Sequence, residues 1–347
     1  MNIRKLRRRK LLFFVSVLLG FFVLVFFVRN LLVSALLAFV GFYLITPLVD
    51  LLERRGMPRI TSVLVPFVTL TAVFFLATQW LLPSFVSQFG SLKGDLPRYL
   101  EKAQRLSVEI EAQAGHFLPP ETAARLTAQV EERLLLWAHR IFEGLPNYVS
   151  DSLTVLFLAP FLCFFMLLDG RSLVRQLLAI VPNHYFELVM NLQHEISFQM
   201  GGFIRARLLE SLIVGVLVAA GLMIMDFKYA LVLALFAAVL NLIPYVGPVI
   251  GALPAYLLAF LGGATSGEFL ALTVIYGGAQ VIDAALILPI LVAKIVNLHP
   301  VTVVLSIMIG SQLMGVLGMI ISIPVTSALK VTLSALYQHL TQFRDEI

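Results

Sequence analysis

The stretch Asn241-Leu-Ile-Pro-Tyr-Val-Gly-Pro-Val-Ile-Gly-Ala-Leu-Pro-Ala255 decides how this chain folds. It lies inside a run from Tyr229 to Leu261 that contains no charged residue, yet it carries three prolines and two glycines. Each proline removes a backbone donor and interrupts helical hydrogen bonding. In hydrocarbon, a freed backbone carbonyl is tolerated only where protein or a water-filled cavity covers it. A broken apolar helix of this kind therefore indicates a segment that lines a site, as the discontinuous helices of secondary transporters do.

The composition indicates a protein that crosses a membrane several times. Apolar residues make up 60% of the 347 residues and charged residues 13%, whereas soluble domains have about 45–50% and 25%. A run of about 20 apolar residues crosses a bilayer as a helix. The sequence predicts an all-α fold with six full spans, at Leu11–Val28, Leu31–Val49, Ile60–Leu82, Val149–Leu168, Leu208–Met225 and Phe269–Ala293.

Two further apolar regions, Tyr229–Leu261 and Pro300–Leu329, fit no single span. The first arm of the earlier region is about 22 Å long as a helix, which is short of the ~30 Å hydrocarbon core. We expect a re-entrant hairpin with its tip at Pro244–Pro248. A second hairpin, with a flexible turn at Gly310–Gly315, would enter from the opposite side as part of an inverted repeat. The alternative is that these two regions are ordinary proline-kinked full spans, which makes eight spans in all, and the side of each terminus is the same in both cases.

Basic residues cluster at the N-terminus and after the second, fourth and sixth spans. The excess of basic residues in cytoplasmic loops places both termini in the cytoplasm. The segment from Pro83 to Pro146 then lies outside the membrane, and its apolar spacing predicts a pair of amphipathic helices. We divide the chain into an N-terminal scaffold of three spans (1–82), extracytoplasmic helices (83–148), span four with cytoplasmic interfacial helices (149–207), a transport core with both hairpins (208–330) and a cytoplasmic tail (331–347).

Asp283 is the strongest single signal among the polar residues at membrane depth. A carboxylate inside a span costs about 2.5–3.5 kcal/mol on insertion scales and usually marks a functional path. Gln280, three residues earlier, shares its helical face. A purely structural carboxylate at a hairpin tip, or one paired with Lys294, is the alternative. The predicted solute-binding residues are Asn241, Pro244, Tyr245, Gly247, Pro248, Gln280, Asp283, Ser311 and Gln312, and the predicted hinges are Gly251, Gly310, Gly315, Gly318 and Pro324.

Motifs for ATP hydrolysis and for intramembrane proteolysis are incomplete or missing. No G-x-x-x-x-G-K-[ST] sequence occurs, so ion or solute gradients would have to supply energy. The pair His194-Glu195 lacks the second histidine of H-E-x-x-H, because Phe198 stands in its place. Ala264-Thr-Ser-Gly267 lacks the first glycine of a rhomboid-type G-x-S-G. We therefore expect no catalytic residues, no metal site, no cofactor and no nucleic-acid partner, while a non-transporting scaffold stays open.

The stretch Asn241–Pro254 resembles the signature of the AI-2E transporter family, which includes an autoinducer-2 exporter and PerM-like permeases. Ile290–Val304, Gly315–Pro324 and the N-terminal Pro47–Gly56 are similar to that family too.

The resemblance implies a bacterial inner-membrane homo-oligomer, with pentamers known for the family, and an elevator-like movement of the hairpins. It implies export of small polar signals in some members and sodium or lithium exchange for protons in others. One deep carboxylate is a poor sodium site by itself. We therefore expect export of a small polar solute, such as an autoinducer-2-like signal, with the bilayer and further copies of the chain as partners.

Overall fold

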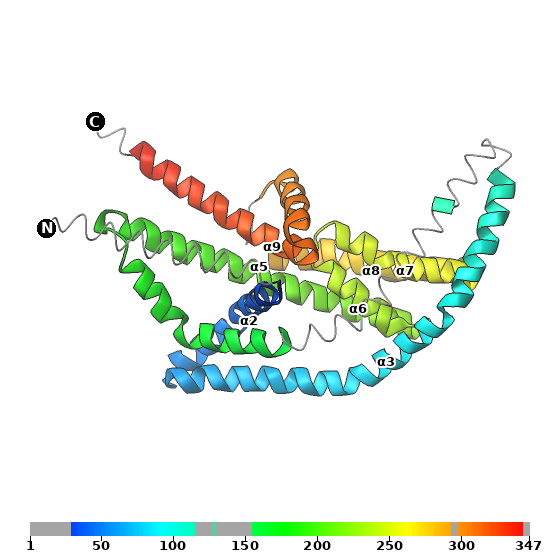
Figure 1. Cartoon of the computed structure of the whole chain (residues 1–347), viewed down its shortest axis with the longest axis horizontal. Helices are drawn as coiled ribbons and strands as arrows, with labels where there is room; N and C mark the ends of the chain where they lie inside the picture. The colour runs from blue at the N-terminus through cyan, green and yellow to red at the C-terminus, as the bar shows by residue number, and fades with distance from the viewer. Residues whose placement is uncertain (1–28, 115–127, 130–154, 293–297, 343–347) are drawn as a thin grey trace. The chain divides into compact units, whose positions relative to one another are not determined.

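The computed structural model describes residues 29–114, 128–129, 155–292 and 298–342, and every regular element in these ranges is a helix (Figure 1). The predicted first span, Leu11–Val28, and most of the segment 115–154 lie outside the described residues. The elements are α2 (Arg29–Arg54), α3 (Arg59–Ala114), a helix at Val155–Leu178, α5 (Asn183–Ile224), α6 (Ala230–Asn241), α7 (Val246–Gly262), α8 (Ser266–Ile282), the π-helix η1 (Asp283–Val292) and α9 (Pro300–Gln342).

Within the described ranges, six helices are long and apolar enough to cross a membrane. They are Leu31–Arg54, Arg59–Arg105, Val155–Leu178, Tyr185–Ile224, Ser266–Ile287 and Pro300–Ala335. This confirms the all-helical membrane class. The six helices are not the six predicted spans, because the first predicted span lies outside the described residues and the last helix covers a predicted hairpin.

Two of the helices run further than the apolar pattern suggests. α3 continues through Pro83 to Ala114, and its three prolines, Pro66, Pro83 and Pro97, each remove one backbone donor from a helix of 56 residues. α5 joins the predicted interfacial segment to the fifth span without a break at Arg207. Arg207 therefore belongs to a continuous helix, and its side chain can be held inside the protein.

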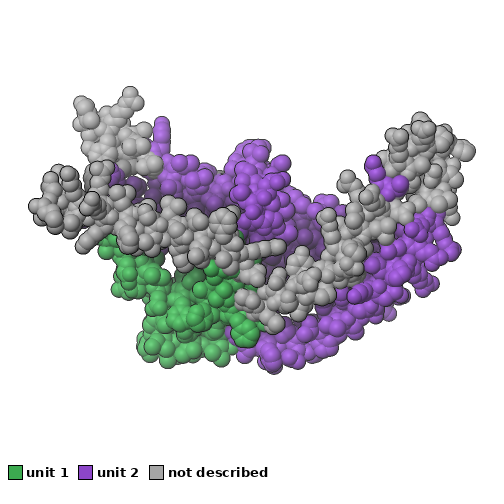
Figure 2. All heavy atoms as spheres, in the orientation of Figure 1, with its two compact units in different colours: residues 1–68, 145–180 green, residues 69–144, 181–347 purple. Residues whose placement is uncertain are grey.

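The chain forms two compact units, residues 1–68 with 145–180 and residues 69–144 with 181–347 (Figure 2). The first unit is tied by charged side chains. Arg171 forms ion pairs of 2.6 Å with both Asp50 and Glu53, and Arg59 pairs with Glu53 at 2.8 Å. Arg59 also donates to the backbone carbonyl of Leu167. Several basic residues that signalled orientation therefore also hold α2 against the helix Val155–Leu178.

The second unit is built around α5, which packs against α6, α8, η1 and α9. Small residues allow the close approach of these helices. Gly215 of α5 faces Ala238 of α6, and Gly221 faces Ile275 of α8. Val218, Leu222, Leu233, Ala255 and Leu272 form the centre of the apolar core.

The first hairpin consists of α6 and α7, joined by the turn Leu242–Tyr245. The turn lies two to three residues earlier than predicted, and Pro248 lies in the first turn of α7. Proline is tolerated there because the first amides of a helix have no intrahelical acceptor. A Cβ at Gly247 would collide with the Leu240 carbonyl, and one at Gly251 would lie 3.1 Å from the Ala237 Cα. These glycines let the two arms touch.

The base of the first hairpin is held by α3. Gln88 accepts a hydrogen bond from the Leu231 amide at 3.0 Å, which satisfies a backbone donor at the start of α6. The Tyr229 hydroxyl donates to Asp95 at 2.5 Å. Burial, and then the neighbouring Asp95, raise the pKa of Tyr229 above its ordinary value, so the hydroxyl keeps the proton that it donates.

The second hairpin is α9, which bends at Gly315 (φ 61°, ψ −138°). We predicted a flexible turn over Gly310–Gly315, but residues 310–314 are helical and only Gly315 leaves the helix. Gly310 and Gly318 press against each other across the bend, each filling the place of the other's Cβ. Thr326 donates to Ser306 at 2.8 Å further along the arms. Gly310 and Gly318 are therefore packing positions, whereas Gly315 supplies the turn.

The predicted sixth span, Phe269–Ala293, divides into α8 and η1. α8 begins at a capping box, in which the Thr265 amide donates to Glu268 at 2.6 Å and the Glu268 amide donates to Thr265 at 3.3 Å. The helix changes from α to π geometry at Asp283. A π-helical turn is rare and is found most often at functional sites.

Candidate functional site

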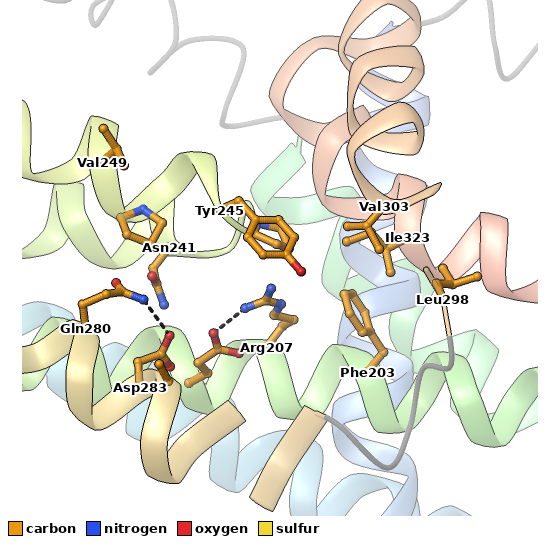
Figure 3. Close-up of a pocket in the computed structure, with 14 residues that line it drawn as sticks. Phe203, Arg207, Asn241, Tyr245, Val249, Gln280, Asp283, Leu298, Val303 and Ile323 are labelled. Carbon is orange, nitrogen blue, oxygen red and sulfur yellow. Dashed lines mark hydrogen bonds and ion pairs between the residues drawn. The ribbon is translucent and has the colours of Figure 1, made fainter. Parts of the chain in front are cut away.

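A cavity of about 530 Å³ lies within the second unit, between α5, the first hairpin, α8 with η1, and the arms of α9 (Figure 3). The residues that line it are Phe203, Arg207, Glu210, Asn241, Pro244, Tyr245, Pro248, Val249, Gln280, Asp283, Ala284, Leu298, Val303 and Ile323. One part of the lining is polar and charged, and the rest is apolar. A cavity that combines a few convergent polar groups with an apolar wall is the usual form of a small-molecule site.

Arg207 and Glu210 form a buried ion pair on α5. They are three residues apart, hence on one helical face, and they are only 7% and 1% exposed. The Arg207 guanidinium also lies 5.8 Å from the centre of the Phe203 ring, which adds a cation–π contact. Since one cation and one carboxylate are paired, this part of the lining carries no net charge.

Asp283 stands at the junction of α8 and η1 and is 3% exposed. Gln280 donates to its Oδ2 at 3.2 Å, and Figure 3 shows these two side chains together at the cavity. The Asp283 and Glu210 carboxyl groups adjoin each other. Two carboxylates this close repel unless a proton or a cation lies between them. With Arg207 beside them, the two carboxyl groups form a cluster that carries one excess negative charge when all three side chains are ionised.

Several buried polar atoms of the lining have no hydrogen-bond partner among the described residues. They are Arg207 Nε, Glu210 Oε2, Asn241 Nδ2 and Asp283 Oδ1. Leaving a buried polar atom unpaired costs about 1–3 kcal/mol. Four such atoms at one cavity indicate a site whose hydrogen bonds are completed by something that enters it.

The apolar wall comes from α5, the segment before α9 and both arms of α9. Phe203, Ile243, Val303, Ile307 and Ile323 pack into one cluster, to which the tip of the first hairpin contributes Ile243. Tyr245 stands at the rim, 62% exposed, with φ 63°. Positive φ is a rare conformation for an aromatic residue and costs of order 1–3 kcal/mol. The fold maintains this strain at the edge of the cavity.

Six of the nine predicted solute-binding residues line the cavity, namely Asn241, Pro244, Tyr245, Pro248, Gln280 and Asp283. Gly247 is outside the lining because it packs against Leu240. Ser311 and Gln312 are also outside, near the bend of α9. Of the predicted hinges, Gly315 is at a bend, Gly251 packs between arms, and Pro324 lies within the second arm of α9.

The sequence analysis missed Arg207 and Glu210. Arg207 was assigned to a cytoplasmic loop as an orientation signal, and the fifth span was started at Leu208. Glu210 then lay inside an apolar run, where a carboxylate is costly and usually functional. The same argument that selected Asp283 would have selected Glu210, with Arg207 one turn earlier as its partner.

Six long apolar helices among the described residues, together with a polar internal cavity, are the features of a polytopic membrane protein. Comparison with known families specifies which one. The model of the AI-2E family transporter matches residues 11–338, and the chain belongs to that family of transport proteins.

Three relatives extend this comparison. The chain is 26% identical to "Putative transport protein YueF" of Bacillus subtilis (strain 168), over 88% of this chain and 84% of the relative. It is 28% identical to "Putative transport protein YrrI" of the same strain, over 83% and 82%. It is 24% identical to "Putative permease PerM" of Escherichia coli (strain K12), over 92% and 91%.

Proposed function

We propose that the chain is a secondary transporter that exports a small polar solute through this cavity in exchange for protons. The observation that carries the proposal is the set of four unpaired buried polar atoms, which come from α5, α6 and the α8–η1 junction and line one cavity. Because the chain belongs to a family of transport proteins, we take the missing partner of these atoms to be a transported solute rather than a permanently bound molecule. An autoinducer-2-like signal is one such solute, suggested by the family resemblance.

Asp283 and Glu210 hold the exchanged proton in this proposal. A proton between the two carboxyl groups removes their repulsion, and a donor group of the solute does the same when the proton leaves. Proton and solute therefore compete for one pair of side chains. Competition of this kind couples the outward movement of one to the inward movement of the other when access to the site alternates.

Access would alternate by an elevator-like movement of the two hairpins. The first hairpin supplies the polar tip and the second supplies apolar wall residues. We further propose that both hairpins are re-entrant, that both termini are cytoplasmic in a bacterial inner membrane, and that the chain forms a homo-oligomer, with a pentamer as the expected form. The bias of basic residues and the family resemblance support these statements.

Exchange of sodium or lithium for protons is the second candidate. The sequence showed one deep carboxylate, and the structure adds Glu210 beside it. However, Arg207 already pairs with Glu210, and the described residues contain no group of three His, Cys, Asp or Glu side chains that could hold a metal ion. A bare cation would have to rely on Asp283 and neutral oxygens.

Substitution of Asp283 tests the proposal. Proteoliposomes with an internal pH indicator are given an imposed pH gradient, and autoinducer-2, sodium chloride, lithium chloride or a low-molecular-mass cell extract is added. We expect wild-type protein to couple proton movement to at least one addition. Asp283→Asn should fold but lose this coupling by roughly tenfold or more, because about 1.4 kcal/mol of lost interaction is a factor of ten. Asp283→Glu should keep part of it.

Asp226→Asn is the matched control. Asp226 is exposed and outside the cavity, and it has φ 55°, which asparagine tolerates. It should behave like wild type. Wild-type coupling in Asp283→Asn, with all four additions, would remove the carboxyl pair from the transport mechanism.

A further inference from the structure

The charges and unpaired atoms of the cavity define what its cargo must present. We infer that the cargo is a small organic cation, a protonated amine that also carries an oxygen acceptor and an alkyl group. The inference rests on the proposed function and narrows the solute class that the cavity would carry.

The positive charge follows from the charge balance of the lining. The titratable groups that line the cavity are Arg207, Glu210, Tyr245 and Asp283. Arg207 and Glu210 neutralise each other, so the remaining charge is that of Asp283, which is 3% exposed. Arg207 also interacts electrostatically with Asp283, but one cation shared by two buried carboxylates leaves one negative charge unbalanced, which is very unfavourable. A proton or a cation must therefore accompany it, and a protonated amine supplies both charge and hydrogen-bond donors.

The oxygen acceptor follows from the unpaired donors. Arg207 Nε and Asn241 Nδ2 lack an acceptor among the described residues, and both side chains are more than nine-tenths buried. A carbonyl or hydroxyl oxygen next to the amino group would accept from them while the ammonium donates to Asp283 Oδ1. Three of the four unpaired atoms of the lining, Arg207 Nε, Asn241 Nδ2 and Asp283 Oδ1, would then be satisfied by one small molecule.

The alkyl group follows from the opposite wall. Phe203, Leu298, Val303 and Ile323 present apolar surface to the cavity. Burying a branched side chain of leucine size against such a wall is favourable, because it removes apolar surface from water. An inorganic cation would use neither this wall nor the unpaired donors of Arg207 and Asn241.

An organic anion fits the same geometry poorly. It would have to replace Glu210 as the partner of Arg207 and would then lie beside two carboxyl groups. Negative charges that lie next to one another repel strongly in a low-dielectric site. A protonated amine leaves the Arg207–Glu210 pair intact, and its arrival releases the one proton that the carboxyl pair held, so the charge of the site does not change.

Three matched probes test the inference with the purified full-length protein in lipid nanodiscs. L-leucinamide carries an ammonium, an amide oxygen and a branched alkyl group. 4-Methylpentanamide lacks the ammonium, and L-leucine adds a carboxylate. Calorimetric titration in two buffers with different ionisation enthalpies measures both affinity and the number of protons released.

We expect L-leucinamide to bind with release of about one proton, and the other two probes to bind at least roughly tenfold more weakly, since a charge-assisted hydrogen bond is worth about 1.5–3 kcal/mol. Asp283→Asn should lose both the affinity and the proton release. Asn241→Leu should lose affinity but keep the proton release, which a general loss of folding would not do. Asp226→Asn should match wild type.

Equal binding of 4-methylpentanamide, tighter binding of L-leucine, or no binding of any probe would overturn the organic-cation class. Sodium that releases the proton and displaces L-leucinamide at millimolar concentration would overturn it in favour of an inorganic cation. In each case the proposed transporter stands if Asp283→Asn still abolishes solute-coupled proton movement in proteoliposomes. It falls if that variant behaves like wild type.

Discussion

The two helical hairpins of the second unit reach the same cavity in different ways. The first hairpin, α6 and α7, contributes its tip and the residues beside it, including the polar Asn241 and Tyr245. The second hairpin, α9, contributes apolar residues from its two arms, Val303 in the first turn of the helix and Ile323 after the bend. Its bend at Gly315 and the neighbouring Gln312 are outside the lining. One hairpin therefore supplies hydrogen bonds and the other supplies an apolar surface.

Their supports differ as well. The base of the first hairpin receives polar contacts from Gln88 and Asp95 of α3. The second hairpin is held mainly by its own arms and by α5, where Ser327 donates to Gln199. These polar contacts fix the start of α6, at the opposite end of that helix from the polar tip. Two helical hairpins that are both bent within an apolar sequence can therefore contribute different kinds of residues to one cavity.

The largest loss of stability is expected for substitutions at the place where the two arms of the first hairpin touch. Gly247→Ala places a Cβ on the Leu240 carbonyl, which is backbone and cannot move aside. Overpacking of this kind costs about 1–3 kcal/mol, and Gly247→Leu should cost more and reduce the amount of folded protein. Thermal unfolding followed by circular dichroism in detergent measures the loss.

Gly277→Ala is the matched control for that substitution. Gly277 lies inside α8 with nothing near its Cβ position, and alanine favours a helix over glycine by about 1 kcal/mol. Gly315→Ala should be intermediate, because its Cβ meets open space but its φ of 61° is strained for alanine. Equal stability of all three variants would contradict the packing described for the first hairpin.

A moderate loss of stability is expected for substitutions at the base of the first hairpin. Tyr229→Phe removes the donor to Asp95 and should cost about 1.5–3 kcal/mol, the usual value for a hydrogen bond to a charged group. Thr326→Val removes the neutral bond to Ser306 in the second hairpin and should cost about 1 kcal/mol. Hydrogen exchange of the α6 and α9 amides compares the two. Faster exchange confined to α9 in Tyr229→Phe would show that α3 does not hold the first hairpin.

The smallest effect is expected at Gln312→Ala. Its side chain is exposed and outside the cavity, so the affinity for L-leucinamide should change by less than about twofold, within the ±0.5 kcal/mol typical of surface substitutions. Gln280→Ala removes the donor to Asp283 and should weaken binding by several-fold. The same calorimetric titration measures both. A larger loss in Gln312→Ala would bring the bend of the second hairpin into the binding site.

The sequence predicted those features that depend on local chemistry. Proline and glycine in an apolar run located the tip of the first hairpin to within three residues, and a lone carboxylate in a span located Asp283. It did not show Arg207 at the site, because a basic residue at the end of an apolar run is equally expected in a cytoplasmic loop.

Long-range geometry accounts for the other differences. Gly247 and Gly310 were expected to serve motion or solute contact. Only the folded hairpins show that their Cβ positions are filled by Leu240 and Gly318. The change to π geometry at Asp283 was not predicted, although Pro289 lies within η1, where proline interrupts α-helical hydrogen bonding.

The capping box at Thr265 also sets the rotation of α8. From Thr265 to Asp283 the helix advances 18 positions, which is about five complete turns of roughly 3.6 residues. The residue that starts the helix and the carboxylate that ends it therefore lie along one line of its surface. Adding or removing one residue between them would swing Asp283 by about 100° around the axis. The number of residues in α8 thus determines the direction in which the Asp283 side chain points. We expect insertions and deletions between Thr265 and Asp283 to be poorly tolerated for this reason.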